Sequence, residues 1–307
     1  MKSVAILLST YNGDRFLREQ LDTLLNQNDV AAEVFVRDDG SSDGTRQILT
    51  EYAENHPTVH LDFAENVGVG NSFMNLLYSV PDSFDYYAFA DQDDIWEADK
   101  LAEAVSLLEE KEGLLYASNQ ECVDKYGNSM GLRYGIKEKI NLTAISILQK
   151  NMLAGCTMVL TNGFYKILTD DNHRPSSELL HNRIHDVWIA VTAALYEGIV
   201  YDERSFIKYR QHENNVVGAN SGGFRRKLKE RMKKLFHSEY RNGRSMLARE
   251  LCSKFPEEVK AYPLIEFSSK ANKLKYKRRL FKNQKQLRAY TGESRFGFFI
   301  KVLFGLY

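Results

Sequence analysis

The chain has 307 residues, of which 43% are hydrophobic and 27% charged, and its formal net charge is zero. This composition is ordinary for a globular protein, so disorder is not the default, and the length permits one large domain with an appendage, or two domains. The charge is unevenly distributed, because residues 224–307 carry 23 Lys and Arg against 7 Glu, a net +16, which leaves −16 on the rest. An acidic body is therefore followed by a basic tail.

The cysteines and the apolar runs indicate the compartment. Cys122, Cys156 and Cys252 are widely spaced and form neither a CxxC pair nor a Cys/His set, which argues against disulfides and structural zinc. The apolar run from Val4 to Leu8 is shorter than a signal-peptide core, and no run approaches the roughly 18 apolar residues of a membrane span. We therefore expect a cytoplasmic protein.

The first half of the sequence alternates short β-rich runs with helical patterns. Strands are predicted at 4–9, 33–38, 59–64 and 86–91, and helices near 14–27, 44–54, 70–79 and 98–111. This alternation predicts βαβ crossovers and a mostly parallel sheet flanked by helices. Ligands bind such sheets at the carboxyl ends of the strands. Polar or glycine-rich segments follow all four strands there, at 9–13, 38–45, 66–71 and 91–94.

From residue 114 to 210 the pattern is mixed. Strands are expected at 114–119 and 156–161, helices at 141–149 and 184–197, and a strand pair at 199–210. Beyond Gly222 and Gly223 the composition changes to Lys/Arg-rich helical segments. We therefore predict two domains, residues 1–222 and a basic helical region of residues 223–307.

The segment AFADQDDIWEADK, residues 88–100, places Asp91, Asp93 and Asp94 directly after an apolar strand. Carboxylates this close repel one another unless a cation or water screens them. In an extended segment Asp91 and Asp93 point the same way, and such a pair suits Mg²⁺ or Mn²⁺ with positions left for phosphate oxygens. The structural alternative is a solvated turn with Asp94 as a helix N-cap.

A second acidic segment, DDGSSDGT, ends the strand predicted at 33–38. Its residues Ser42 to Thr45 are explained by a turn and a helix N-cap. Asp38 and Asp39 are less easily explained in this way, because a carboxylate at a strand end can accept a hydrogen bond from a ribose hydroxyl or a base N–H.

Four segments, in this order and spacing, resemble the family-two glycosyltransferases with the GT-A fold: LLSTYNGDRFLREQLDTLLNQ, VRDDGSSDGT, ENVGVGNSF and FADQDDIWEADKL. The resemblance covers roughly residues 2–215. It implies transfer of a sugar from a nucleoside diphosphate sugar to an acceptor hydroxyl. It further implies that the nucleoside is contacted by Thr10, Tyr11 and Asp39, with Asn71 nearby.

The resemblance also implies the metal ligands. Asp91 would face the ribose and the cation, and Asp93 would be the principal ligand of Mn²⁺ or Mg²⁺, bridging to the diphosphate. Such a cation stabilises the charge on a departing nucleoside diphosphate. In KYRQHENNVVG, residues 208–218, the resemblance implies a loop that closes over the donor, with His212 completing the shell of the cation and Arg210 touching phosphate.

The segment RIHDVWIAV, residues 183–191, predicts a helix with Asp186 in its first turn and Trp188 and Ile189 in the core. The resemblance implies that Asp186 is the general base for the acceptor hydroxyl, a role that suits a positioned carboxylate. A first-turn acid that only stabilises the helix is the alternative. His185 is left outside the catalytic set.

The basic tail interleaves cations with apolar residues at helical spacing, in RRKLKERMKKLF at 225–236 and in KANKLKYKRRLFKNQKQL at 270–287. This pattern favours a helix lying on an anionic membrane, where each basic residue contributes about 1 kcal/mol. Since no RNA-binding motif accompanies the charge, we do not expect nucleic acid as a partner. Helical packing or a homodimer is the alternative.

These patterns together predict an inverting, metal-dependent glycosyltransferase at the inner membrane face, acting on a lipid-linked or oligosaccharide acceptor in surface polysaccharide synthesis. DQDDIW, HDVW and YRQHENNVVG resemble the rhamnosyltransferase-type branch, which implies dTDP-L-rhamnose, while UDP-glucose and UDP-galactose stay open. Two rivals are a metal-dependent phosphohydrolase and a non-catalytic sugar-nucleotide-binding module. The first would need a nucleophilic Asp where this chain has Ser9, Thr10, Tyr11 and Asn12.

Overall fold

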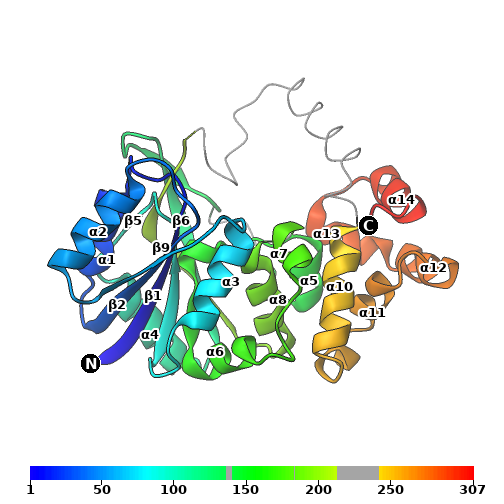
Figure 1. Cartoon of the computed structure of the whole chain (residues 1–307). Helices are drawn as coiled ribbons and strands as arrows, with labels where there is room; N and C mark the ends of the chain where they lie inside the picture. The colour runs from blue at the N-terminus through cyan, green and yellow to red at the C-terminus, as the bar shows by residue number, and fades with distance from the viewer. Residues whose placement is uncertain (136–139, 183, 213–241) are drawn as a thin grey trace. The chain divides into compact units, whose positions relative to one another are not determined.

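The structure, a computed structural model, describes residues 1–135, 140–182, 184–212 and 242–307 (Figure 1). The chain divides into two compact units. The first comprises the described parts of Met1–Lys139, Leu153–Asp171 and Gly198–Val216, and the second those of Ile140–Met152, Asn172–Glu197 and Val217–Tyr307. The predicted boundary at 222/223, the loop beyond His212 and the basic segment 225–236 lie outside the described residues.

The first unit is built on one mixed sheet. Within the described residues its strand order is β3-β2-β1-β4-β8-β6-β9-β5, and β7 pairs with β6. The strands are β1 (Lys2–Thr10), β2 (Val30–Asp38), β3 (Val59–Phe63), β4 (Tyr86–Ala90), β5 (Ile95–Trp96), β6 (Leu115–Val123), β7 (Ser129–Leu132), β8 (Val159–Thr161) and β9 (Ile199–Arg210). Strands β1 to β4 run parallel, and β8 is antiparallel to both β4 and β6.

The buried strands follow from their residues. All five positions of β4, YYAFA, are buried, and so is Val4 to Leu8 of β1, as expected for central strands covered on both faces. The helices of this unit are α1 (Leu17–Leu25), α2 (Thr45–Asn55), α3 (Val69–Ser79), α4 (Lys100–Glu110) and α6 (Asn162–Thr169). In α1 the buried residues Leu17, Leu21 and Leu24 recur at helical spacing and pack into the core.

The register brings the strand ends together. Thr10 of β1 lies opposite Asp38 of β2, Asp38 lies opposite Phe63 of β3, and Leu8 lies opposite Ala90 of β4. The four polar segments that follow these strands therefore begin at one edge of the sheet, as the sequence predicts.

Two predicted elements differ in the structure. Residues 199–210 form one strand, β9, so the predicted strand pair is wrong. The polar stretch in its middle is a bulge against β6, because Asp202 accepts a hydrogen bond from the Arg204 amide and Ser205 accepts one from the Glu121 amide. The strand expected at 156–161 begins as a 3₁₀ turn, Gly155–Thr157, and only Val159–Thr161 is extended.

The second unit is helical in its described residues. Its helices are α5 (Ala144–Gln149), α7 (Ser177–Asn182), α8 (His185–Leu195), α10 (Gly243–Lys254), α11 (Pro263–Ser269), α12 (Leu274–Lys282), α13 (Gln284–Thr291) and α14 (Arg295–Leu303). Trp188 of α8 and Phe255 are fully buried with ring centroids 5.8 Å apart. The hydroxyl of Tyr307 accepts a hydrogen bond from Gln149 at 2.7 Å, which fixes the end of the chain. No helix among the described residues has the length and apolar content to cross a membrane.

Candidate functional site

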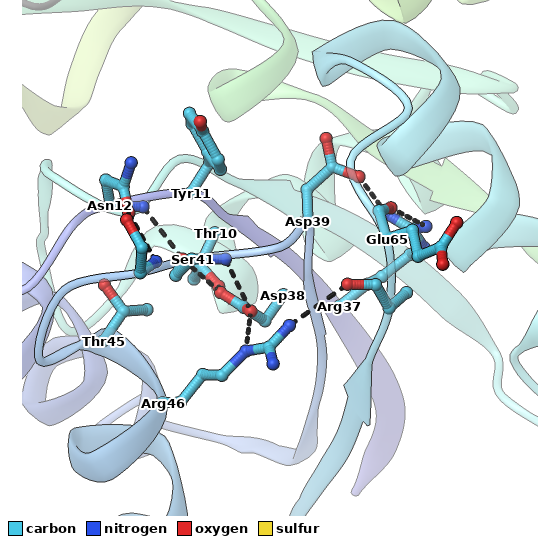
Figure 2. A network of polar contacts seen from close by, with 12 residues as sticks. Thr10, Tyr11, Asn12, Arg37, Asp38, Asp39, Ser41, Thr45, Arg46 and Glu65 are labelled. Carbon is cyan, nitrogen blue, oxygen red and sulfur yellow. Dashed lines mark hydrogen bonds and ion pairs between the residues drawn. The ribbon is translucent and has the colours of Figure 1, made fainter.

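Asp38 holds together the loops after β1 and β2 (Figure 2). Its buried carboxylate accepts hydrogen bonds from the Thr10 hydroxyl at 3.1 Å, from the Ser41 amide at 3.0 Å, from the Ser41 hydroxyl, and from Nε of Arg46 at 2.6 Å. Burial raises the pKa of Asp38, but the hydrogen bonds from Ser41, Arg46 and Thr10 outweigh burial and hold the pKa below its usual value. Asp38 is therefore an anion that positions its neighbours.

Asp39 lies beside a buried arginine and the loop after β3. Its Oδ1 accepts hydrogen bonds from Nη1 of Arg37 at 2.5 Å and from the Val67 amide at 3.0 Å, and its Oδ2 accepts one from the Gly68 amide at 3.0 Å. A carboxylate oxygen can accept two hydrogen bonds. Oδ2 therefore retains acceptor capacity for a ribose hydroxyl or a base N–H, which is the role predicted for Asp39.

The other predicted nucleoside contacts differ in exposure. Tyr11 is 51% exposed, so its ring is accessible for stacking on a base, whereas Thr10 and Asn71 are buried. The amide of Asn71 donates to the Val67 carbonyl at 3.2 Å. Thr10 and Asn71 therefore hold the loops in place behind Tyr11 and Asp39.

The acidic segment after β4 separates into two groups. The first comprises Asp91, Asp94 and Cys156, whose ligand atoms lie within 4.8 Å of one another. Burial, and then the negative charge of Asp93, raise the pKa of Asp91 to about 7, although Asp91 keeps partial exposure. Burial likewise raises the pKa of Asp94 well above its usual value. Carboxylates in this state are stabilised by an added positive charge.

The second group pairs Asp93 with the end of β9. Oδ2 of Asp93 lies 2.7 Å from Nε2 of His212, so the structure brings together the predicted ligand from the acidic segment and the predicted ligand 119 residues later. Carboxylate oxygens and an imidazole nitrogen form a donor set that fits Mn²⁺. The Asp93–His212 pair is thus a candidate cation site next to the Asp91, Asp94 and Cys156 group, and the ligand role of Asp91, Asp93 and His212 stays a prediction.

Arg210 fixes the arrangement of these groups. Its backbone amide donates to Asp94 at 3.1 Å, its Nε donates to the Asp93 carbonyl at 3.0 Å, and its Nη2 contacts Glu19 at 2.5 Å. These bonds join β9, the acidic segment and α1. The contact of Arg210 with phosphate stays a prediction. The alternative of Asp94 as a helix N-cap is wrong, because α4 begins at Lys100 and Asp94 instead accepts from Arg210.

Lys100 lies within the core of the first unit. It is fully buried, its Nζ lies 3.8 Å from the centre of the Trp96 ring, and no hydrogen-bond partner of this atom occurs among the described residues. Burial lowers the pKa of Lys100 to about 7, while electrostatic interaction with Cys156 and Asp94 opposes the change. Since attraction alone would raise the pKa of Lys100 and lower that of Asp94, burial is the larger effect on both.

Asp186 belongs to the second unit. It lies in the first turn of α8, and Trp188 and Ile189 of the same helix are buried, as predicted. Burial lowers the pKa of the preceding His185 to about 3, so this imidazole is neutral. The role of Asp186 as general base stays a prediction.

Comparison with known proteins decides the family. Residues 5–168, more than half of the chain, match the family described as "Glycosyl transferase family 2". The chain belongs to glycosyl transferase family 2. It is 30% identical over 224 residues to dTDP-rhamnosyl transferase RfbG of Shigella flexneri, covering 69% of this chain and 74% of that protein. It is 25% identical over 221 residues to the uncharacterized glycosyltransferase RT0329 of Rickettsia typhi, covering 68% of this chain and 64% of that one.

Solved structures agree on the fold. The crystal structure of S. aureus TarS 1-349 in complex with UDP-GlcNAc superposes with a TM-score of 0.58 at 17% identity, covering 95% of this chain and 88% of that chain. The fold is therefore GT-A, as predicted, and the chain is a nucleotide-sugar glycosyltransferase of family 2.

Sequence reasoning missed three residues of this candidate site. Oε1 of Gln92 accepts a hydrogen bond from the Tyr11 amide at 2.8 Å, and Nε2 of Gln92 donates one to the Tyr11 carbonyl at 3.1 Å. These bonds connect the acidic segment to the loop after β1. The positive charge of Arg133 lowers the pKa of Asp91, and Asp94 raises the pKa of Lys100. For Gln92, the signal in the sequence is its position between Asp91 and Asp93.

The Asp38 hydrogen bonds predict a stability effect. Replacing Asp38 with Asn places an amide NH₂ against donors that now bind a carboxylate, so Asp38→Asn should lower the free energy of unfolding by about 1 to 3 kcal/mol at pH 7. Urea unfolding measures this change. Asp62→Asn, an exposed carboxylate on β3, is the control. A loss no larger than that of the control would contradict the assignment.

The buried amine of Lys100 predicts a pH-dependent gain. Because its folded pKa lies below the ordinary 10.5, folding releases a proton, and the destabilisation is largest below pH 7 and shrinks as the pH rises towards 10.5. Lys100→Met should therefore stabilise the protein by about 1 to 4 kcal/mol near pH 7, and less at higher pH.

Thermal unfolding of Lys100→Met and the wild type at neutral and alkaline pH measures this difference. Lys111→Met, at an exposed position just after α4, should show no comparable pH-dependent gain. A gain from Lys100→Met that grows with pH would refute the account of Lys100.

Proposed function

We propose that this chain is an inverting, Mn²⁺- or Mg²⁺-dependent transferase whose donor is dTDP-L-rhamnose. The sugar choice is supported by the 30% identity to a protein named dTDP-rhamnosyl transferase over 69% of this chain. UDP-glucose or UDP-galactose is the alternative donor, since the contacts described for Asp39 and Tyr11 suit the nucleoside and carry no information on the sugar.

The observation that carries the proposal is the Asp93–His212 pair beside Asp91. These three residues would hold the divalent cation. When bound, the cation supplies positive charge to the departing nucleoside diphosphate. Asp39 and Tyr11, at the same edge of the sheet, would bind the nucleoside, with Thr10 and Asn71 supporting them. The protein groups thereby orient the donor before reaction.

The proposed reaction is a single displacement. Asp186 accepts the proton of the acceptor hydroxyl, and the hydroxyl oxygen forms a bond to the anomeric carbon as the bond from that carbon to the diphosphate oxygen breaks. The nucleoside diphosphate leaves, and the anomeric configuration inverts. A carboxylate in the first turn of a helix, held by the buried Trp188 and Ile189, is suited to remain fixed during proton transfer.

The acceptor is proposed to be a lipid-linked or oligosaccharide hydroxyl used in cell-surface polysaccharide synthesis. The protein would work in the cytoplasm, on the inner face of the membrane, with the basic region 223–307 against anionic lipid. Nucleic acid is not a proposed partner. A homodimer formed through the basic region is the alternative use of that region.

Transfer assays test the catalytic assignments. With dTDP-rhamnose, Mn²⁺ and a rhamnose-accepting glycan, Asp93→Ala should lower kcat/KM by about 100-fold or more, and Asp186→Asn should lower kcat by about 100-fold or more with little change in KM. Product NMR should show inversion at the anomeric carbon.

The exposed acid Glu110, replaced by Ala, is the matched control and should retain activity. Full activity of either Asp variant, with unchanged thermal unfolding, would remove that residue from its role. Release of inorganic phosphate in place of transfer would favour the phosphohydrolase, and binding without turnover would favour the non-catalytic module.

A further inference from the structure

Helix α14 has apolar residues on two faces. Phe298 and Val302 are buried in the second unit. Phe296, Phe299 and Leu303 recur at positions i, i+3 and i+7, and are 74%, 44% and 42% exposed. This second face is therefore an apolar stripe in contact with solvent, and the 68% exposed Phe304 follows directly after the helix.

Helix α12 lies beside this stripe. Its Phe281 ring stacks on the Phe299 ring with centroids 5.2 Å apart, and Nζ of Lys277 donates to the Leu303 carbonyl at 2.7 Å. At the start of α12, Leu274 is 67% exposed. The two helices thus form one surface, the α12–α14 face, defined by Leu274, Phe281, Phe296, Phe299, Leu303 and Phe304.

The charge around this face has one sign. Residues 270–307 contain 11 Lys and Arg against the one acid Glu293, a net +10. Glu293 is paired with Arg244 at 2.7 Å and with Lys301 at 2.6 Å, so its charge is already neutralised. On α12 the exposed cations include Lys275, Arg278 and Lys282. A surface that combines exposed phenylalanines with unopposed cations is typical of proteins that bind a membrane interface.

We propose that the α12–α14 face docks on an anionic lipid bilayer. The exposed phenylalanines would enter the boundary between headgroups and acyl chains, while Lys275, Arg278 and Lys282 lie against lipid phosphates. This inference deepens the membrane part of the proposed function and assigns it to named residues. Docking of this face on a bilayer requires neither the sugar donor nor the acceptor.

The charge of the α12–α14 face also favours a bilayer over other binding partners. In a twofold dimer the same surface meets itself, so the net +10 of one copy would face the net +10 of the other. Anionic lipid offers both an apolar layer and negative charge. A single-stranded nucleic acid could bind cations and stack on rings, and it is an outcome of the test below.

Co-sedimentation of the full chain with vesicles tests the proposal. The wild type should bind phosphatidylcholine vesicles that contain phosphatidylglycerol and should bind pure phosphatidylcholine weakly. The double variants Phe296→Ser/Phe304→Ser and Lys275→Glu/Arg278→Glu should each lose about tenfold or more in affinity, since one removes apolar insertion and the other removes attraction to phosphate. Thermal unfolding checks that both variants fold.

Tyr126→Ser, which removes a 76% exposed ring from the first unit, is the control and should bind as the wild type does. Wild-type affinity of both double variants, or no preference for phosphatidylglycerol, would overturn the proposal. Binding to single-stranded RNA without binding to vesicles would assign the face to nucleic acid. Dimers that the phenylalanine variant dissociates, without vesicle binding, would assign it to a second copy. Vesicle binding does not require sugar transfer. Failure of the proposed transferase activity can therefore be distinguished from failure of the proposed membrane docking.

Discussion

The constraint on which this structure depends is the repulsion among Asp91, Asp93 and Asp94 at the end of a buried strand. Burial raises the pKa values of Asp91 and Asp94, so the protein holds these carboxylates in a high-energy arrangement. The hydrogen bond from the Arg210 amide to Asp94, the contact of Asp93 with His212 and the positive charge of Arg133 near Asp91 offset part of that repulsion. A bound divalent cation would offset the rest, which couples the folding of this edge to the binding of its ligand.

The sheet topology makes this arrangement possible. Strand β9 pairs in parallel with β6 and antiparallel with the two-residue strand β5, so the end of β9 lies against the acidic segment although the two are more than 100 residues apart in sequence. The parallel strands β1 to β3 place the residues proposed to contact the nucleoside on the same edge. The hydrogen bonds of Gln92 with Tyr11 then join the metal candidates to the nucleoside candidates.

Much of the first unit follows from local sequence. Strands β1 to β4 and the helices between them could be predicted because each is specified by its own apolar periodicity, and the parallel order places Asp39 and Asp91 at one edge. The pairing of Asp93 with His212 was available only through the family resemblance. The burial of Lys100 and the partners of Gln92 depend on contacts across the fold that no local pattern encodes. The sequence does not predict the single strand β9, because the polar Asp202 and Ser205 are typical of a turn. In the structure their side chains accept hydrogen bonds from backbone amides at a bulge.

We propose that the acidic edge binds a nucleoside diphosphate through a divalent cation, and calorimetric titration measures this binding. Titration of dTDP and UDP into the purified chain should give an affinity with Mn²⁺ at least about tenfold higher than with EDTA, and Asp93→Ala should abolish that difference. Equal affinity with and without the cation in the wild type would contradict the claim.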